Sequence, residues 1–226
     1  MNMRASSEEL LHYIKTSTSP FHVVNTSKEY LSKEGFSELR LTEKWELSKG
    51  GKYYVDCYGT TVFAITVGEE LSDSIEFRVC AAHTDHPCLK IKPHPEMRDH
   101  GYLKINTDVY GGPIVNTWMD RPLSVAGKVA IKSNSIFEPE IRFVDFKRPI
   151  MTIPNLAIHM NREVNKGVEL NRQKDTIPVL GLVNETLDQN NFFVEALAKE
   201  LGVEVSDILD FDLYVYMILC TVPYIY

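Results

Sequence analysis

One stretch decides the fold: Val79-Cys80-Ala81-Ala82-His83-Thr84-Asp85-His86-Pro87. An apolar run, which we expect to form a strand over residues 75–82, leads directly into a His-x-Asp pair. Open α/β sheets bind their ligands at the carboxyl ends of strands, so this pair is a candidate ligand site. A metal-ligating histidine usually gives its second ring nitrogen to an oxygen acceptor, which Asp85 could supply. A structural histidine is the commoner role, and the pair alone does not decide between the two.

Completing a metal site requires partners that the sequence does not clearly supply. A catalytic metal needs further ligands and a general base besides one histidine. Glu69 and Glu70 lie in a polar turn that indicates a solvated loop, and Asp120 beside Arg121 is typical of an ion pair or a turn. His159 follows an apolar segment. It is either a metal or substrate contact or a hydrogen-bonded structural residue.

Composition excludes several classes of protein. The chain has 226 residues, 44% of them hydrophobic, and a net charge of −7, which indicates a soluble globular protein without the basic surplus of a nucleic-acid binder. The longest apolar run, residues 213–226, is too short to cross a bilayer. Residues 1–15 lack the apolar core of a secretory signal, so we do not expect secretion. Four cysteines without CxxC spacing are typical of reduced thiols, so we expect a cytoplasmic protein. Nucleotide-binding glycine loops and the GxSxG elbow are absent from the sequence.

The order of predicted elements indicates two parts. Residues 1–93 combine helices, the second starting at Ser19-Pro20, with strands at 52–58, 61–67 and 75–82, which is an α/β arrangement. Residues 94–226 predict mainly strands, at 102–109, 123–132 and 140–146, with one helix over 191–201. The fold class is therefore α/β, with a partial α/β domain followed by a β-rich domain.

Four motifs together carry a family resemblance. They are Thr18-Ser19-Pro20-Phe21-His22, Ala82-His83-Thr84-Asp85-His86-Pro87-Cys88-Leu89-Lys90, Tyr110-Gly111-Gly112 with Trp118-Met119-Asp120-Arg121-Pro122-Leu123-Ser124, and Ile153-Pro154-Asn155-Leu156-Ala157-Ile158-His159-Met160-Asn161-Arg162-Glu163-Val164-Asn165. Their combination resembles the M18 family of metallo-aminopeptidases, the aspartyl aminopeptidase type. The similarity extends to about Tyr216.

The resemblance implies an activity, a cofactor and an assembly. Members of the family remove N-terminal residues from peptides with one or two zinc ions. Their α/β peptidase domain is interrupted by a β-rich dimerisation domain, and their subunits form a hollow homo-oligomeric dodecamer. We therefore expect a peptide substrate and further copies of the chain as partners, and neither nucleic acid nor membrane. By resemblance, His83 is the first metal ligand and Asp85 the catalytic carboxylate that supports it. His159 would either touch metal or bind substrate in a neighbouring subunit's site.

The chain also departs from the family pattern. The family's bridging Asp, its Glu-Glu pair, a further acidic ligand and its final His lie beyond the region that this sequence matches. From about residue 217 the sequence becomes an uncharged tail, which resembles a frameshifted or prematurely ended reading frame; a short edge strand is the alternative. We expect an N-terminal half that is inactive alone. The alternative is a non-catalytic assembly or dimerisation module, or the product of a broken gene.

Overall fold

The chain forms two units that are described separately below. A computed structural model describes residues 3–70, 76–135, 137–183 and 191–218. Internal contacts divide the chain into an N-terminal unit, Met1–His86, and a C-terminal unit, Pro87–Tyr226. The boundary at 93/94 that the sequence suggested lies inside a strand, β4 (Cys88–Asp99).

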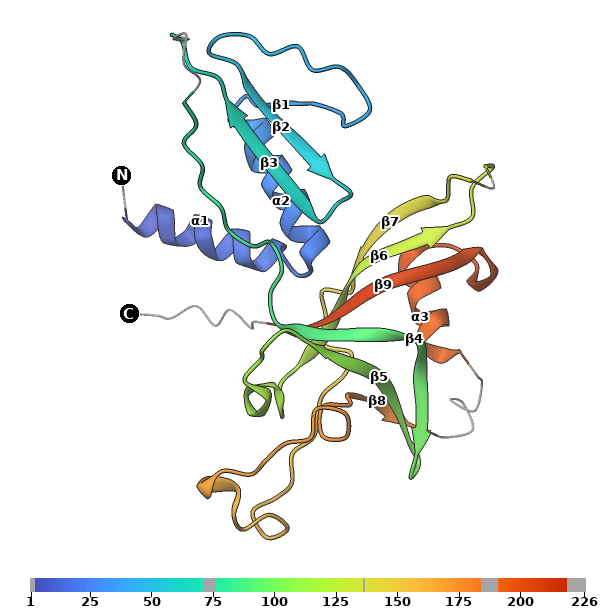
Figure 1. Cartoon of the computed structure of the whole chain (residues 1–226). Helices are drawn as coiled ribbons and strands as arrows, with labels where there is room; N and C mark the ends of the chain where they lie inside the picture. Colours follow the sequence, from blue (N-terminus) through green and yellow to red (C-terminus); the bar gives the residue numbers. More distant parts are fainter. Residues whose placement is uncertain (1–2, 71–75, 136, 184–190, 219–226) are drawn as a thin grey trace. The chain divides into compact units, whose positions relative to one another are not determined.

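In its described residues, the N-terminal unit consists of two helices and a small sheet (Figure 1). Its elements are α1 (Met3–Thr16), α2 (Pro20–Lys33), β1 (Ser37–Glu38), β2 (Lys52–Cys57) and β3 (Thr61–Thr66). Helix α2 starts as predicted, because Ser19 accepts the His22 amide and Pro20 occupies the first turn. The hairpin β2–β3 is also confirmed, and β1 adds to β2 in parallel. Phe21 and Val24 of α2 are buried, as is Val55 of β2.

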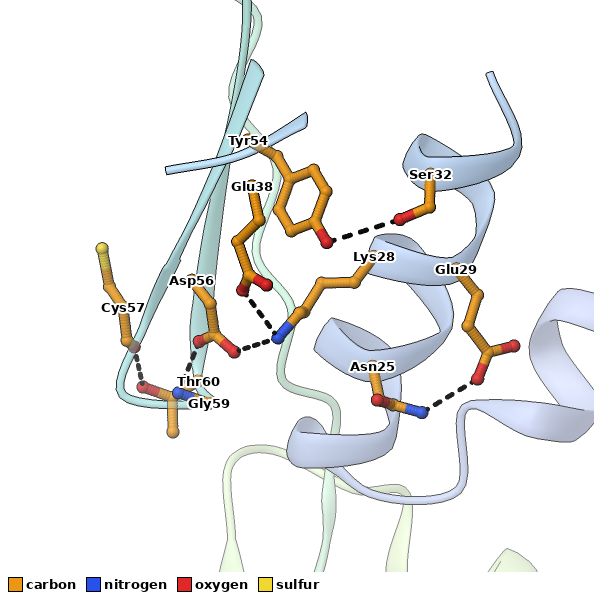
Figure 2. A network of polar contacts seen from close by, with 10 residues as sticks. All are labelled: Asn25, Lys28, Glu29, Ser32, Glu38, Tyr54, Asp56, Cys57, Gly59 and Thr60. Atoms are coloured by element: carbon orange, nitrogen blue, oxygen red, sulfur yellow. Dashed lines mark hydrogen bonds and ion pairs between the residues drawn. The ribbon is translucent and has the colours of Figure 1, made fainter. Parts of the chain in front are cut away.

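A charged network joins α2 to this sheet (Figure 2). The Lys28 ammonium lies 2.8 Å from Asp56 Oδ2 and 3.1 Å from Glu38 Oε1. The second Asp56 oxygen accepts the Gly59 amide at 2.7 Å, in the turn between β2 and β3. One cation therefore holds a helix, the short strand β1 and a hairpin turn together.

Replacing Lys28 by methionine tests this network. Burial lowers the pKa of Lys28, but hydrogen bonds and charges from Asp56 and Glu38 outweigh burial and raise it above the usual 10.5. We expect a loss of about 1–2 kcal/mol in the free energy of unfolding at pH 8, measured by urea denaturation. A raised pKa stabilises the fold fully below pH 10.5, and this contribution disappears as the pH rises through the folded-state pKa. The difference between wild type and variant should therefore shrink above that pH.

Lys49→Met is the control for this change, because Lys49 is exposed and lies in the loop before β2. It should leave the unfolding free energy within about 0.5 kcal/mol of wild type. A Lys28→Met deficit that stays constant up to pH 11.5 would contradict an ionic origin.

The C-terminal unit is built on a six-stranded sheet in the order β7-β6-β9-β4-β5-β8 (Figure 1). All of its ladders are antiparallel. Its strands are β4, β5 (Tyr102–Tyr110), β6 (Leu123–Ile131), β7 (Glu140–Asp145), β8 (Val179–Leu182) and β9 (Ile208–Met217). Its helices are α3 (Phe192–Leu201) and the short 3₁₀ turns η1 (Val115–Trp118), η2 (Val164–Lys166) and η3 (Val205–Asp207). None of the helices in the described ranges is long and apolar enough to cross a membrane.

Helix α3 packs on one face of this sheet. Phe193 and Leu197 are buried, and the Phe193 ring meets the Phe211 ring of β9 edge to face at 6.5 Å. The residue before the helix, Asn191, has a left-handed backbone and provides no side-chain cap. Instead, the Glu96 carboxylate of β4 accepts the amides of Asn191 at 3.2 Å and Phe193 at 2.5 Å. A negative charge supplied from the sheet thus stabilises the positive end of the helix.

Removing this carboxylate should loosen α3. We expect Glu96→Ala to lower the free energy of unfolding by about 1–2 kcal/mol, because the amides of Asn191 and Phe193 at the start of α3 lose their acceptor. Thermal denaturation followed by circular dichroism measures the change. Glu169→Ala, at an exposed loop position, is the control and should have little effect. Equal melting temperatures for both variants would show that Glu96 does not stabilise α3.

One predicted element is wrong. Residues 76–82 form no strand, and every residue from Glu76 to His83 is exposed. The alternation of apolar and polar side chains suits a strand, but a strand also needs a neighbour to satisfy its backbone, and the described chain provides none. The start of this prediction at Ile75 and the tail at 219–226 lie outside the described residues.

Candidate functional site

His83 and Asp85 lie together at the end of the N-terminal unit. His83 Nδ1 is 2.6 Å from the Asp85 carbonyl oxygen and 3.1 Å from Asp85 Oδ1. Both neighbours are oxygens without a proton to give, so Nδ1 carries the hydrogen and donates it. In the neutral imidazole, Nε2 is then the free electron-pair donor, on a side chain that is 80% exposed. This is the arrangement in which histidines bind metal.

The segment around this pair is anchored at one point. Thr84 Oγ1 donates to the Thr60 carbonyl at 2.7 Å, in the turn between β2 and β3. His86 is half-buried, and burial lowers its pKa more than the Asp85 carboxylate raises it. The imidazole of His86 is therefore neutral near pH 7, and adds no positive charge beside His83.

His159 lies in the C-terminal unit, on a loop that leaves the sheet after Ile153. Its turn is closed by Met160 and Asn161 amides that donate to the Ala157 carbonyl at 2.8 and 3.2 Å. The imidazole is exposed, and so are the neighbouring apolar side chains, which are Leu156, Ile158 and Met160. The loop thus presents a histidine among apolar groups.

Asp120 holds the base of this loop. Its Oδ1 accepts the Asn155 amide at 3.0 Å, and its own amide donates to the Ile153 carbonyl at 2.9 Å. Its φ of 56° is unusual for a residue other than glycine, and aspartate is among the residues that tolerate it. The sequence left two interpretations of Asp120 open, an ion pair or a turn, and the turn is confirmed. Its link to the His159 loop was missed, because a side-chain bond spanning 35 residues has no local signal.

The candidate metal-binding residues do not form a complete donor set within the described residues. His83 and Asp85 come together in one unit, whereas His159 belongs to the other. No group of three or more His, Cys, Asp or Glu side chains that could hold a metal occurs in the described residues. A catalytic zinc normally has three protein ligands, so the imidazole suits zinc but the donor set is incomplete. No catalytic step through zinc can be derived from these side chains alone.

Residues 13–219 match a family model described as "Aminopeptidase I zinc metalloprotease (M18)". The chain belongs to the M18 family. A protein of Clostridium novyi named "Probable M18 family aminopeptidase 2" is 51% identical over 209 residues, which are 92% of this chain and 48% of the relative. One of the same name from Clostridium acetobutylicum is 45% identical over 210 residues, again 92% and 48%. The chain therefore spans about half the length of these curated relatives.

Solved structures of M18 proteins confirm the α/β fold expected from the sequence. Chaetomium thermophilum mApe1 superposes with a TM-score of 0.81 at 27% identity, over 93% of this chain and 50% of that one. The Saccharomyces cerevisiae mApe1 dodecamer gives a TM-score of 0.73 at 26% identity, over 97% and 49%. The partial coverage agrees with a chain that corresponds to half of the family protein.

Proposed function

We propose that this chain is the N-terminal half of a zinc-dependent aminopeptidase and that it hydrolyses nothing by itself. The match of residues 13–219 to the M18 zinc metalloprotease family carries the proposal. The incomplete donor set of the described residues supports the second part. The substrate class would be peptides with a free N-terminus, as the family name implies. Cys57, Cys80 and Cys88 form no disulfide within the described part of the chain, which is consistent with a reducing, cytoplasmic location.

Each candidate residue has a definite task in this proposal. His83 would ligate zinc through Nε2, and Asp85 would hold the ring by accepting its Nδ1 proton. Zinc in such peptidases supplies an activated water and polarises the scissile carbonyl. His159, exposed on its loop, would contact the substrate or the metal, in its own or a neighbouring subunit's site. The dodecamer of the yeast relative supports a homo-oligomeric assembly.

The direct test is an assay of the purified 226-residue chain. The chain is incubated with aminoacyl-p-nitroanilides and added Zn²⁺ or Co²⁺. The His83→Ala variant is assayed in parallel as the blank. We expect both proteins to show the same background rate. Robust turnover by the wild type that His83→Ala abolishes would overturn the proposed inactivity, while supporting the role of His83.

A non-catalytic assembly module is the second candidate. It is favoured by the apolar side chains on both edge strands of the six-stranded sheet, where Ile141 and Phe143 of β7 are 50% and 47% exposed and Leu182 of β8 is 61% exposed. Exposed apolar groups at sheet edges promote pairing with another chain. A discrete oligomer by light scattering without metal would favour this role, whereas a monomer would exclude it.

A further inference from the structure

An open groove lies in the C-terminal unit, along the outer edge of β8. Its volume is about 480 Å³, and Tyr102 lines it together with residues 120–122, 149–152 and 179–182. Tyr102 and Leu182 are 44% and 61% exposed, so large side chains with apolar surfaces face water here. Exposed apolar groups that line a groove of this size are typical of a place where another segment binds.

Strand β8 has a free outer edge because two paired segments diverge beside it. Val179 of β8 exchanges two backbone hydrogen bonds with Thr152, at 2.7 and 3.1 Å. The two amides just before Thr152, those of Met151 and Ile150, instead donate to the Leu123 carbonyl, at 3.2 and 2.9 Å. On its other side, β8 pairs with β5. The outer edge of the rest of β8 therefore receives no backbone bond from another segment in the described ranges, and such an edge can take one more strand.

Strand β9 ends at the rim of this groove. It pairs with β6 as far as Met217 and Leu123. One further bond follows, from the Ile218 amide to the Pro122 carbonyl at 3.0 Å, and Pro122 lines the groove. The rest of the chain, residues 219–226, therefore continues from the rim of the groove.

We propose that residues 219–226, which lie outside the described part of the chain, dock in this groove and add a strand to the outer edge of β8. Their sequence carries no charge and is rich in the β-branched and aromatic residues that favour strands: Leu219-Cys220-Thr221-Val222-Pro223-Tyr224-Ile225-Tyr226. Such a tail gains free energy by covering apolar side chains, which Tyr102 and Leu182 provide. The match to the M18 family ends at residue 219, so this docking is a property of the chain's own sequence.

The tail is long enough for this path. One segment lies between β6 and β8, because Met151 bridges to Leu123 of β6 and the adjacent Thr152 bridges to Val179 of β8. Two strand spacings, roughly 10 Å, therefore separate β6 from β8 at this point. Extended residues span roughly 3.3 Å each, so residues 219–226 reach up to about 26 Å. About half of the tail is then left to pair with β8.

Amide hydrogen exchange, followed by mass spectrometry, tests the docking on the 226-residue chain. A variant that ends at Ile218 lacks the tail and is compared with the full chain. We expect the amides of β8 to exchange on the order of tenfold faster in the shortened variant, because they lose a neighbouring strand. Strand β7, at the opposite edge of the same sheet, should exchange equally in both proteins. Equal exchange of β8 in the two proteins would overturn the proposal.

Leu182→Asp tests the same contact in a chain of full length. The aspartate puts a charge where the tail would bury an apolar side chain, so exchange of residues 219–226 should rise on the order of tenfold. Ile141→Asp is the matched control, since Ile141 is 50% exposed on β7 and should leave exchange of the tail unchanged. Equal exchange of the tail in the two variants would contradict docking at β8. Protection of β8 that survives removal of the tail and falls on dilution would assign the groove to a second copy of the chain, which also overturns the proposal.

Discussion

Replacing Gly127 by alanine is expected to destabilise the C-terminal unit by roughly 3 kcal/mol, a large fraction of a typical domain's stability. Gly127 lies in β6 between β7 and β9, paired with Val144 on one side and Leu213 on the other. A Cβ at this position would lie 2.2 Å from the Asp212 carbonyl oxygen and 2.9 Å from Leu213 Cα. These are backbone atoms of β9, so no side-chain rotation can relieve the overlap. The neighbouring strands β6 and β9 must therefore move apart.

Gly112→Ala separates this steric effect from the general cost of replacing a glycine. A Cβ at Gly112 would meet nothing within 4 Å, so this variant should unfold within about 0.5 kcal/mol of wild type. Urea denaturation followed by tryptophan fluorescence suits the comparison, because Trp118 is buried in the C-terminal unit. Similar midpoints for the two variants would show that β6 and β9 tolerate a methyl group and that their close approach does not constrain the sheet.

The sequence predicted helices and strands correctly where nearby residues determine them. Ser19-Pro20 marked the start of α2, and the strands at β2, β3, β5, β6 and β7 followed from their patterns. Strand β4 was missed because His94-Pro95 and Asp99-His100-Gly101, after Pro93, were interpreted as a break. The structure explains how Pro93 and Pro95 are tolerated in this strand. The ladder with β5 pairs residues up to Ile91 and resumes at Glu96, so neither proline has to donate a backbone hydrogen bond to β5.

Features that depend on distant residues could not be read from the sequence. Segment 76–82 has the right alternation for a strand, yet pairing depends on a neighbour that no local pattern reveals. In the candidate site, the His83–Asp85 contact spans two residues and was predictable from spacing. Two other contacts join segments far apart in sequence: the Asn155 amide donates to Asp120, and Glu96 caps α3. They can be recognised only in the folded structure.

His83→Ala is expected to abolish aminopeptidase activity in a protein that joins this chain to the unmatched remainder of the Clostridium novyi relative, with a loss of kcat/KM well above a hundredfold. The variant removes the proposed zinc ligand itself. Asp85→Asn should cost less, about 10- to 100-fold, because the imidazole remains and only the charged acceptor at its Nδ1 is lost. Zinc content, measured by mass spectrometry of the metal, provides a readout independent of turnover. Excess Zn²⁺ should restore much of the metal bound by Asp85→Asn but not that of His83→Ala.

His100→Ala is an unusually close control for this pair. His100 also holds a neighbouring carboxylate, with Nδ1 2.5 Å from Asp99 Oδ1, and its side chain is 89% exposed. It lies in the turn between β4 and β5 of the C-terminal unit, whereas His83 belongs to the N-terminal unit. If the local His–Asp contact alone conferred metal binding, His100→Ala would lose zinc as well. We expect it to retain full activity and zinc, because a ligand histidine also needs partners that converge on the same ion. Equal losses in His83→Ala and His100→Ala would refute His83 as the specific ligand.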